Sequence, residues 1–228
     1  MKVVMITPPA GRPTATARCW VSLLLAGFCL VAALLHVEPL LEFDRAAIAS
    51  GAWWRMLSGH AVHFGFEHLA WDLGVFVLLA ALIERRDRAA LVWCVVAAAV
   101  TISLNLWFFA PTIVIYRGLS GIDSALVAMY ATQVLMRRGE HSRSMRLIVG
   151  LALAGLAAKT VIEFRFGATV FVNHVAASFE PVPIAHLVGG ATGALLAMCA
   201  ATTSSLREVA PGQRRRWRRC DRCQPGNQ

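Results

Sequence analysis

The chain has 228 residues, of which 57% are hydrophobic and only 15% are charged, and its formal net charge at pH 7 is +9. This composition excludes a disordered chain and a coiled coil, and it leaves too little polar sequence for the wetted basic face of a nucleic-acid-binding protein. We therefore expect the lipid bilayer, and not a nucleic acid, to be the surrounding partner of the chain.

Uncharged or nearly uncharged stretches recur at the length that a helix needs to cross a bilayer, roughly 20 residues for ~30 Å of hydrocarbon. We predict an all-α polytopic membrane protein, a bundle of six transmembrane helices. The spans are expected at residues 19–35, 68–83, the first part of 89–116, 119–136, 147 to about 162, and 184 to about 203.

The third stretch is too long for one span, and local signals predict where its helix ends. Pro111 lacks the backbone N–H that a helix interior uses, and the residues at 112–115 are all β-branched. We therefore expect this helix to stop near Phe109 and a loop to follow.

Basic residues are concentrated in alternate connections. The segments 1–18, 85–88, 137–146 and 204–228 hold 17 of the 22 Lys and Arg residues. Because Lys and Arg in short loops stay in the cytoplasm, both termini are predicted to be cytoplasmic. The chain then divides into a cytoplasmic N-terminal segment (1–18), a membrane domain (19–203) and a basic cytoplasmic tail (204–228). No small-x-small cleavage site directly follows the first span, so we expect this span to be retained.

Three polar residues lie at one depth in the even-numbered spans. His68, Ser120 and His186 each precede the cytoplasmic end of their span by 16 or 17 residues, which is roughly 25 Å of helix. They should therefore meet just below the outer surface of the membrane. Asp72 follows His68 by one turn on the same helix face, and ionisable groups inside spans are functional candidates.

Ser120 stands between Gly118 and Gly121 at a predicted helix start. Glycine on both sides of a serine leaves the hydroxyl uncovered and lets the backbone of a substrate come close. This is the environment expected of a reacting hydroxyl.

Small residues follow His186 along the sixth span, at Gly189 and Gly193. They let this span press against a neighbouring helix, which would bring the imidazole within reach of Ser120. His186 could then take the hydroxyl proton while Ser120 attacks a carbonyl, and later protonate the leaving amine. The sequence thus predicts a Ser-His dyad that cuts a peptide bond inside the membrane, with no metal or other cofactor.

With these motifs in register, the chain resembles the rhomboid intramembrane serine proteases over about residues 50 to 200, the catalytic core. The resemblance implies that Ser120 is the nucleophile and His186 the general base, and that His68 and the backbone N–H of Ser120 help to form the oxyanion hole. It also implies transmembrane proteins as substrates. The motifs that carry it are Trp54-Arg55, His63, His68, Glu84, Gly118-Leu119-Ser120-Gly121 and Ala185-His186-x-x-Gly189-x-x-x-Gly193.

Two departures from the common rhomboid pattern point to one branch of the family. Asp72 stands where the family usually has Asn, and Ser124 stands where it usually has Tyr. An ionised Asp72 would repel an oxyanion, so it should be protonated, or paired to His68 and orienting that ring. With these features the chain is similar to the rhombosortases, which are bacterial and process proteins that carry a C-terminal Gly-Gly-containing membrane anchor with a basic tail. The resemblance implies the bacterial inner membrane, with the active site facing the periplasm.

Three other interpretations remain open. Ser120 and Asp123 also fit a capping pattern, S-x-x-[DE], in which the serine only caps the fourth helix and Asp123 is structural. The His68-x-x-x-Asp72 pair, with His186 and the serine, could instead hold zinc in a membrane amidase or ceramidase-like hydrolase. The third interpretation is an inactive rhomboid-like protein that binds membrane clients.

The remaining polar side chains are expected to be structural. His60 and His63 precede the second span and are predicted to be interfacial or solvated, with a supporting role near the site as the alternative. Glu84 is predicted to pair with nearby arginines. Cysteines within the spans are expected to be small core residues. Cys220 and Cys223 form a lone C-x-x-C in the tail, which falls short of the four ligands of a zinc site.

Overall fold

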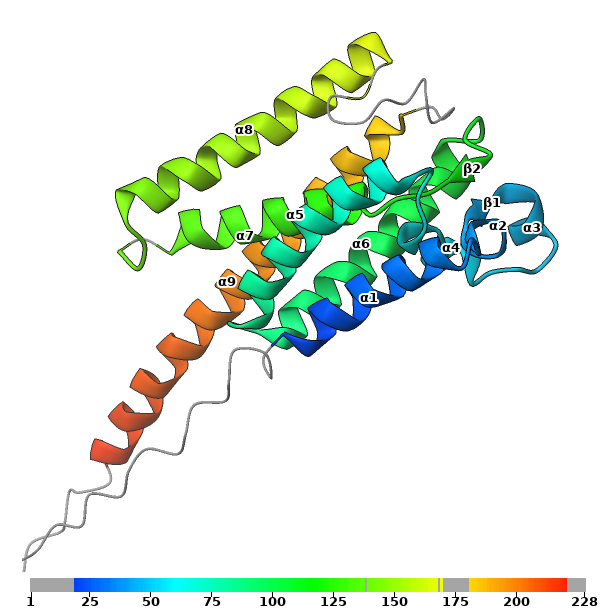
Figure 1. The fold of residues 1–228 in the computed structure, drawn as a ribbon. Helices are drawn as coiled ribbons and strands as arrows, with labels where there is room; N and C mark the ends of the chain where they lie inside the picture. Colours follow the sequence, from blue (N-terminus) through cyan, green and yellow to red (C-terminus); the bar gives the residue numbers. More distant parts are fainter. Residues whose placement is uncertain (1–18, 138, 168, 170–180, 221–228) are drawn as a thin grey trace, which may run out of the picture.

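Long helices pack around one central helix, α7, and a small two-stranded sheet lies at one end of the bundle (Figure 1). The computed structural model describes residues 19–137, 139–167, 169 and 181–220, with side chains as far as Thr202. The predicted N-terminal segment 1–18 and Cys223 lie outside the described residues. The described elements are α1 (Trp20–Leu34), α2 (Glu38–Leu41), β1 (Phe43–Asp44), α3 (Arg45–Ala49), α4 (Arg55–Ser58), the 3-10 helix η2 (Gly59–Ala61), α5 (Phe66–Glu84), α6 (Arg88–Phe109), β2 (Ile115–Tyr116), α7 (Ser120–Met136), α8 (Arg143–Phe166) and α9 (Pro183–Cys220).

Four of the described helices are long and apolar enough to cross a bilayer, namely α5, α6, α8 and the Pro183–Thr202 part of α9. The helices α1, with 15 residues, and α7, with 17, match two further predicted spans but are shorter. The chain is thus a multi-pass, mostly helical membrane protein. The count of six spans and the side of the membrane on which the termini lie stay predictions.

The helix α6 ends at Phe109, where Pro111 predicts its end. The guanidinium of Arg45 donates hydrogen bonds to the carbonyls of Leu106 at 2.6 Å and of Ala110 at 3.1 Å. The last carbonyls of a helix have no helical partner and carry the negative end of its dipole. A cation placed there stabilises the end of the helix and the loop that follows.

The helices α8 and α9 are longer than the sequence predicts. The expected span of 147 to about 162 misses four residues at each end of α8. Ser142 caps the start, because its hydroxyl accepts a hydrogen bond from the N–H of Met145 at 3.2 Å, and Gly167 stops the helix with a left-handed φ of 63°. In turn, α9 continues to Cys220, through most of the segment predicted as a tail.

Two short strands, absent from the all-α prediction, hold the segment that leads into α7. The strands β1 and β2 pair antiparallel, and beside them the guanidinium of Arg117 lies 2.6 Å from the carboxylate of Glu42. The chain therefore enters α7 from a fixed position. The register places Phe43 opposite Tyr116 and Asp44 opposite Ile115.

The central helix and α8 differ sharply in burial. Eleven of the 17 residues of α7 are buried, whereas α8 buries only Val149, Thr160 and Glu163 among its 24 residues. Figure 1 shows α8 as the outermost of the long helices. A carboxylate buried on such a helix needs a partner, because an unpaired buried charge is costly.

Glu84, at the end of α5, ties this helix to the start of α1. Its carboxylate accepts hydrogen bonds from the Ser22 hydroxyl at 2.6 Å and from the backbone N–H groups of Val21 and Ser22 at 3.1 and 2.9 Å. Arg88 lies 3.1 Å away, as the predicted pairing with a nearby arginine requires. The buried acid thus fastens two helices together at one end of the bundle.

Candidate active site

Ser120 is the first residue of α7, and its side chain does not cap that helix. The residue at the N-cap position is Leu119, and no side-chain hydrogen bond closes the helix start. The capping interpretation of Ser120 is therefore wrong. Instead the Ser120 Oγ lies 3.0 Å from Nε2 of His186, within hydrogen-bonding distance.

His186 lies in the first turn of α9, and two glycines let α9 press against α7. A Cβ on Gly189 would lie 2.0 Å from the carbonyl oxygen of Gly121, and one on Gly193 would lie 2.0 Å from that of Ala125. No side chain fits there. This backbone-to-backbone approach brings the imidazole of His186 to the serine, and Gly121 is itself crowded, since its own Cβ would lie 2.8 Å from a side-chain carbon of α6.

Two residues of α8 complete the surroundings of His186, and the sequence analysis missed both. The carboxylate of Glu163 lies 2.8 Å from Nδ1 of His186 through Oε2, and 2.6 Å from Nζ of Lys159 through Oε1. The apolar run predicts that this span ends near residue 162, one residue before Glu163. The available signal was a Lys and a Glu four residues apart at the end of that run.

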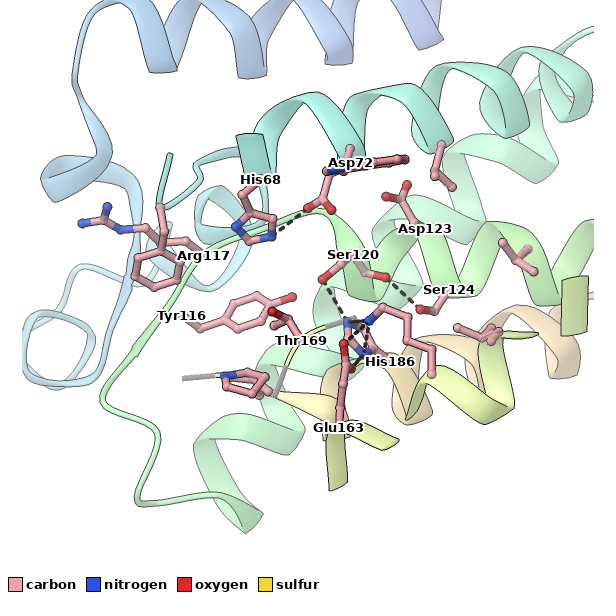
Figure 2. A pocket seen from close by; sticks show the side chains of 18 residues that line it. His68, Asp72, Tyr116, Arg117, Ser120, Asp123, Ser124, Glu163, Thr169 and His186 are labelled. Atoms are coloured by element: carbon pink, nitrogen blue, oxygen red, sulfur yellow. Dashed lines mark hydrogen bonds and ion pairs between the residues drawn. The ribbon is translucent and has the colours of Figure 1, made fainter. Parts of the chain in front are cut away.

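On the opposite side of Ser120, one carboxylate oxygen of Asp72 gathers three groups. Its Oδ2 lies 3.2 Å from Nε2 of His63 and 3.3 Å from Nε2 of His68, and it accepts a hydrogen bond from the Leu119 N–H at 3.0 Å. Figure 2 shows His68 and Asp72 above Ser120, and His186 with Glu163 below it. Asp72 thus pairs with His68, and it also holds the residue that precedes the serine.

Glycine is required at position 118, because the ring of His68 lies close to the backbone there. The φ of Gly118, +126°, is one that L side chains rarely adopt, and an added Cβ would lie 3.0 Å from Cε1 of His68. The glycine therefore keeps the turn before Ser120 close to the histidine ring.

The expectation that His60 and His63 are interfacial or solvated is wrong, because both are buried, at 2% and 4% exposure. The Nε2 of His60 lies 3.2 Å from the Ala99 carbonyl and 3.1 Å from the Ser103 hydroxyl, so this ring ties the loop before α5 to α6. Burial lowers the pKa of His60 to about 4. Burial also lowers the pKa of His63, against the opposing pull of the Asp72 carboxylate.

A cavity of about 270 Å³ opens beside Ser120 and His186, between α5, α7 and α8. Asp123 and Ser124, one turn after the serine, also line it. Asp123 is buried, and its Oδ1 has no hydrogen-bond partner among the described residues. The apolar part of the lining consists of Phe64, Trp71, Val75, Val127, Leu156, Pro181 and Val182.

The residues of the zinc interpretation lie apart. His68 and Asp72 lie on one side of Ser120, and His186 lies on the other (Figure 2). Within the part of the chain that the structure describes, no three His, Cys, Asp or Glu side chains gather as metal ligands would. This donor arrangement does not favour a zinc-dependent amidase.

Comparison with known proteins assigns the chain to a family. The rhomboid domain model matches residues 50–203. A Bacillus subtilis (strain 168) protein named "Putative rhomboid protease YdcA" is 24% identical over 111 residues, which are 46% of this chain and 56% of that protein. The chain thus spans little more than half the length of this relative. The family match covers well over half of the chain and includes every motif of the predicted resemblance, which is confirmed at this level: the chain belongs to the rhomboid family.

Proposed function

We propose that the chain is an intramembrane serine endopeptidase in which Ser120 is the nucleophile and His186 the general base. The observation that carries the proposal is the contact of 3.0 Å between Oγ and Nε2, made at the edge of a cavity. A hydroxyl beside an imidazole is the arrangement of nucleophilic acyl transfer, and its apolar surroundings suit a substrate that comes from the bilayer.

The reaction proceeds through two acyl transfers. His186 removes the proton of the Ser120 hydroxyl as the oxygen attacks the scissile carbonyl, and it then gives this proton to the leaving amine, so that an ester forms and the amide bond breaks. Water, deprotonated by the same imidazole, hydrolyses the ester and restores the serine. An unwound substrate is needed, because helical carbonyls are engaged in their own hydrogen bonds.

The start of α7 supplies stabilisation for the oxyanion. The amides of the first turn have no acceptor within the helix, and the positive end of the helix dipole points at the same place. The N–H of Leu119 donates to Asp72. We assign the oxyanion to the N–H of Ser120, as the rhomboid resemblance implies, with His68 beside it. Asp72 holds His68 by its Nε2 and so orients this ring.

For the substrate, we propose a single transmembrane anchor at the C-terminus of a client protein, with a Gly-Gly pair near the outer surface of the bacterial inner membrane, as in the rhombosortase branch. The similarity of the Asp72 and Ser124 positions to that branch supports the proposal. Glycines unwind easily from a helix and present a backbone without side chains to a narrow cavity.

Labelling by a fluorophosphonate probe tests the assignment of the dyad. The purified protein in detergent should react covalently with the probe, and both Ser120→Ala and His186→Ala should abolish the reaction. The matched control is Ser50→Ala, which removes a serine that is exposed and far along the chain from the site. Undiminished labelling of Ser120→Ala would reject the proposal, and a folded native protein that never reacts would favour the inactive, client-binding interpretation. Hydrolysis that chelators abolish and Ser120→Ala retains would favour the zinc interpretation.

A further inference from the structure

We propose that Glu163 is a positioning residue for His186, the third side chain of a Glu-His-Ser relay, and that Lys159 holds Glu163 in place. The proposal rests on the proposed function of Ser120 and His186 and adds two residues of α8 to it. It changes the expected dyad into a triad whose acid comes from the most exposed of the long helices.

The two ring nitrogens of His186 face different neighbours. Glu163 Oε2 lies 2.8 Å from Nδ1 of the ring, and the Ser120 Oγ lies 3.0 Å from Nε2. The negative charge beside Nδ1 favours the neutral tautomer that carries its proton on that nitrogen, and this tautomer leaves the lone pair of Nε2 for the proton of the serine hydroxyl. This is the tautomer that a general base requires.

The ammonium of Lys159 lies close to both ring nitrogens. Its Nζ lies 3.2 Å from Nδ1 and 3.3 Å from Nε2 of His186. In the ring plane, the carbon between the two nitrogens would block a group placed equally far from both, so the ammonium lies over the face of the ring. It therefore leaves room for Glu163 beside Nδ1 and for Ser120 beside Nε2, and its contact of 2.6 Å with Oε1 holds the other end of the carboxylate.

Local helix preferences do not account for the position of Glu163. The residue belongs to the last turn of α8, at the negative end of the helix dipole, where a carboxylate is disfavoured. It is only 2% exposed on a helix that buries few side chains. A solvated i,i+4 ion pair would need no such burial, so the contact with His186 accounts for the position.

Glu163 acts when the charge on the ring changes. As the Ser120 proton moves to Nε2, the imidazole becomes a cation, and the carboxylate 2.8 Å away stabilises it. The cation returns to the neutral ring when the leaving amine takes the proton, and the carboxylate stays ionised throughout. The charged or titratable groups that share the cavity with His186 are Lys159 and Glu163 of α8, Asp123 of α7, Asp72 and His68 of α5, and Tyr116 and Arg117 before α7.

The test measures the rate of fluorophosphonate labelling in the native protein and in Glu163→Gln and Glu163→Ala. Loss of the acid of a catalytic triad costs on the order of 10⁴-fold in rate, and we expect a loss of at least about 10²-fold here, in the maximal labelling rate and not in the half-saturating probe concentration. The matched control is Glu140→Gln, the same change in an exposed ion pair with Arg137, which should leave the rate unchanged.

The pH dependence separates positioning from mere support of the fold. Glu163→Gln removes a negative neighbour of His186, so the acidic limb of the labelling profile should move to lower pH, whereas Lys159→Met removes a positive neighbour and should move this limb to higher pH. A residue that only fastens α8 would lower the amount of folded protein without moving the limbs in opposite directions.

Failure of the relay and failure of the proposed function give different labelling results. If the native protein is labelled at Ser120 and requires His186, but the Glu163 variants keep its rate and its acidic limb, the relay is overturned while the proposed function stands. If Ser120→Ala is labelled like the native protein, the proposed function itself fails. Should Glu163→Ala not fold, Glu163→Gln, which nearly keeps the volume of the side chain and removes its charge, allows both measurements.

Discussion

Two carboxylates hold histidines on opposite sides of Ser120, and each does so with a different second contact. Asp72 binds His68 and the backbone before the serine, whereas Glu163 binds His186 and a lysine. In the proposed reaction, the first acid organises the place where the oxyanion forms, and the second organises the base.

A stability test at the residue scale concerns His60. The folded ring stays neutral down to its pKa of about 4, because burial disfavours the cation, whereas a histidine in the unfolded chain takes up a proton near its ordinary value of 6.5. Between these values the unfolded chain binds more protons, so stability falls as the pH falls from 6.5 toward 4, by about 3 kcal/mol in total. Above pH 7 this residue should add no pH dependence.

Thermal unfolding in detergent, followed between pH 4 and pH 8, measures the effect. On acidification, the Tm of the native protein should fall more steeply than the Tm of His60→Gln. The glutamine lacks the titrating ring and can still donate to the Ala99 carbonyl. Equal slopes in the two proteins would show that His60 is charged in the folded state.

The sequence alone predicted that Ser120 and His186 meet, because each lies near the start of a helix whose other end could be recognised in the sequence, so that depth could be counted. It was insufficient for Glu163, since a count from the apolar run ended the helix one residue before it. The burial of His63 was also missed, because the path of a loop follows from tertiary contacts, here with Asp72, and not from periodicity.

At the scale of elements, the closest approach in the bundle is that of α7 and α9, where glycine replaces side chains. The alignment of His186 with Ser120 depends on this approach, because His186 lies only one turn before Gly189. A change that separates the two backbones should therefore reduce both stability and reactivity.

Neighbouring glycines of α9 allow a matched comparison. In Gly189→Ala the new Cβ would meet a backbone oxygen at 2.0 Å, whereas in Gly190→Ala its nearest contacts lie at 3.9 Å. Overpacking against a rigid backbone costs ~1–3 kcal/mol or more, so Gly189→Ala should lower Tm by several degrees and slow probe labelling. Gly190→Ala should be neutral or stabilising through its helix propensity. Equal Tm values for the two variants would contradict the packing of α9 on α7.

Some element boundaries could be predicted and others could not, for physical reasons. Pro111 marks the end of α6 in the sequence itself, because it cannot continue a helix. The caps of α8 at Ser142 and Gly167 lie beyond its apolar run, so hydropathy alone ends the span too early. The strands β1 and β2 are two residues each, too short for an alternating pattern to appear.

At the scale of the whole molecule, the predicted orientation and the proposed substrate can be tested together. A secreted reporter protein carrying a C-terminal Gly-Gly anchor with an arginine tail should be cleaved near the outer end of its anchor when it is produced with the native chain. The cleavage should be absent with Ser120→Ala. We expect this cut because the arginine tail fixes the orientation of the anchor, so that its Gly-Gly pair lies at the same depth in the membrane as Ser120.

A second reporter, in which the Gly-Gly pair is moved to the cytoplasmic end of the same anchor, serves as the control and should remain intact. Mass spectrometry of the released reporter locates the cut. Cleavage of the second reporter alone would show that the orientation predicted from the basic residues is reversed. If neither reporter is cleaved, the proposed class of substrate is wrong, and the dyad is tested by the probe experiment alone.

The pairing of Lys159 with Glu163 also bears on how the protein is made. The two residues lie on one helix, so their ion pair can form as soon as α8 is synthesised, whereas His186 is added only later, at the start of α9. A lone carboxylate in an apolar helix resists insertion into the bilayer, and a neutral pair resists it less. Lys159 therefore lowers the cost of inserting Glu163 into the membrane, because it neutralises the carboxylate before α9 is synthesised and His186 can contact it.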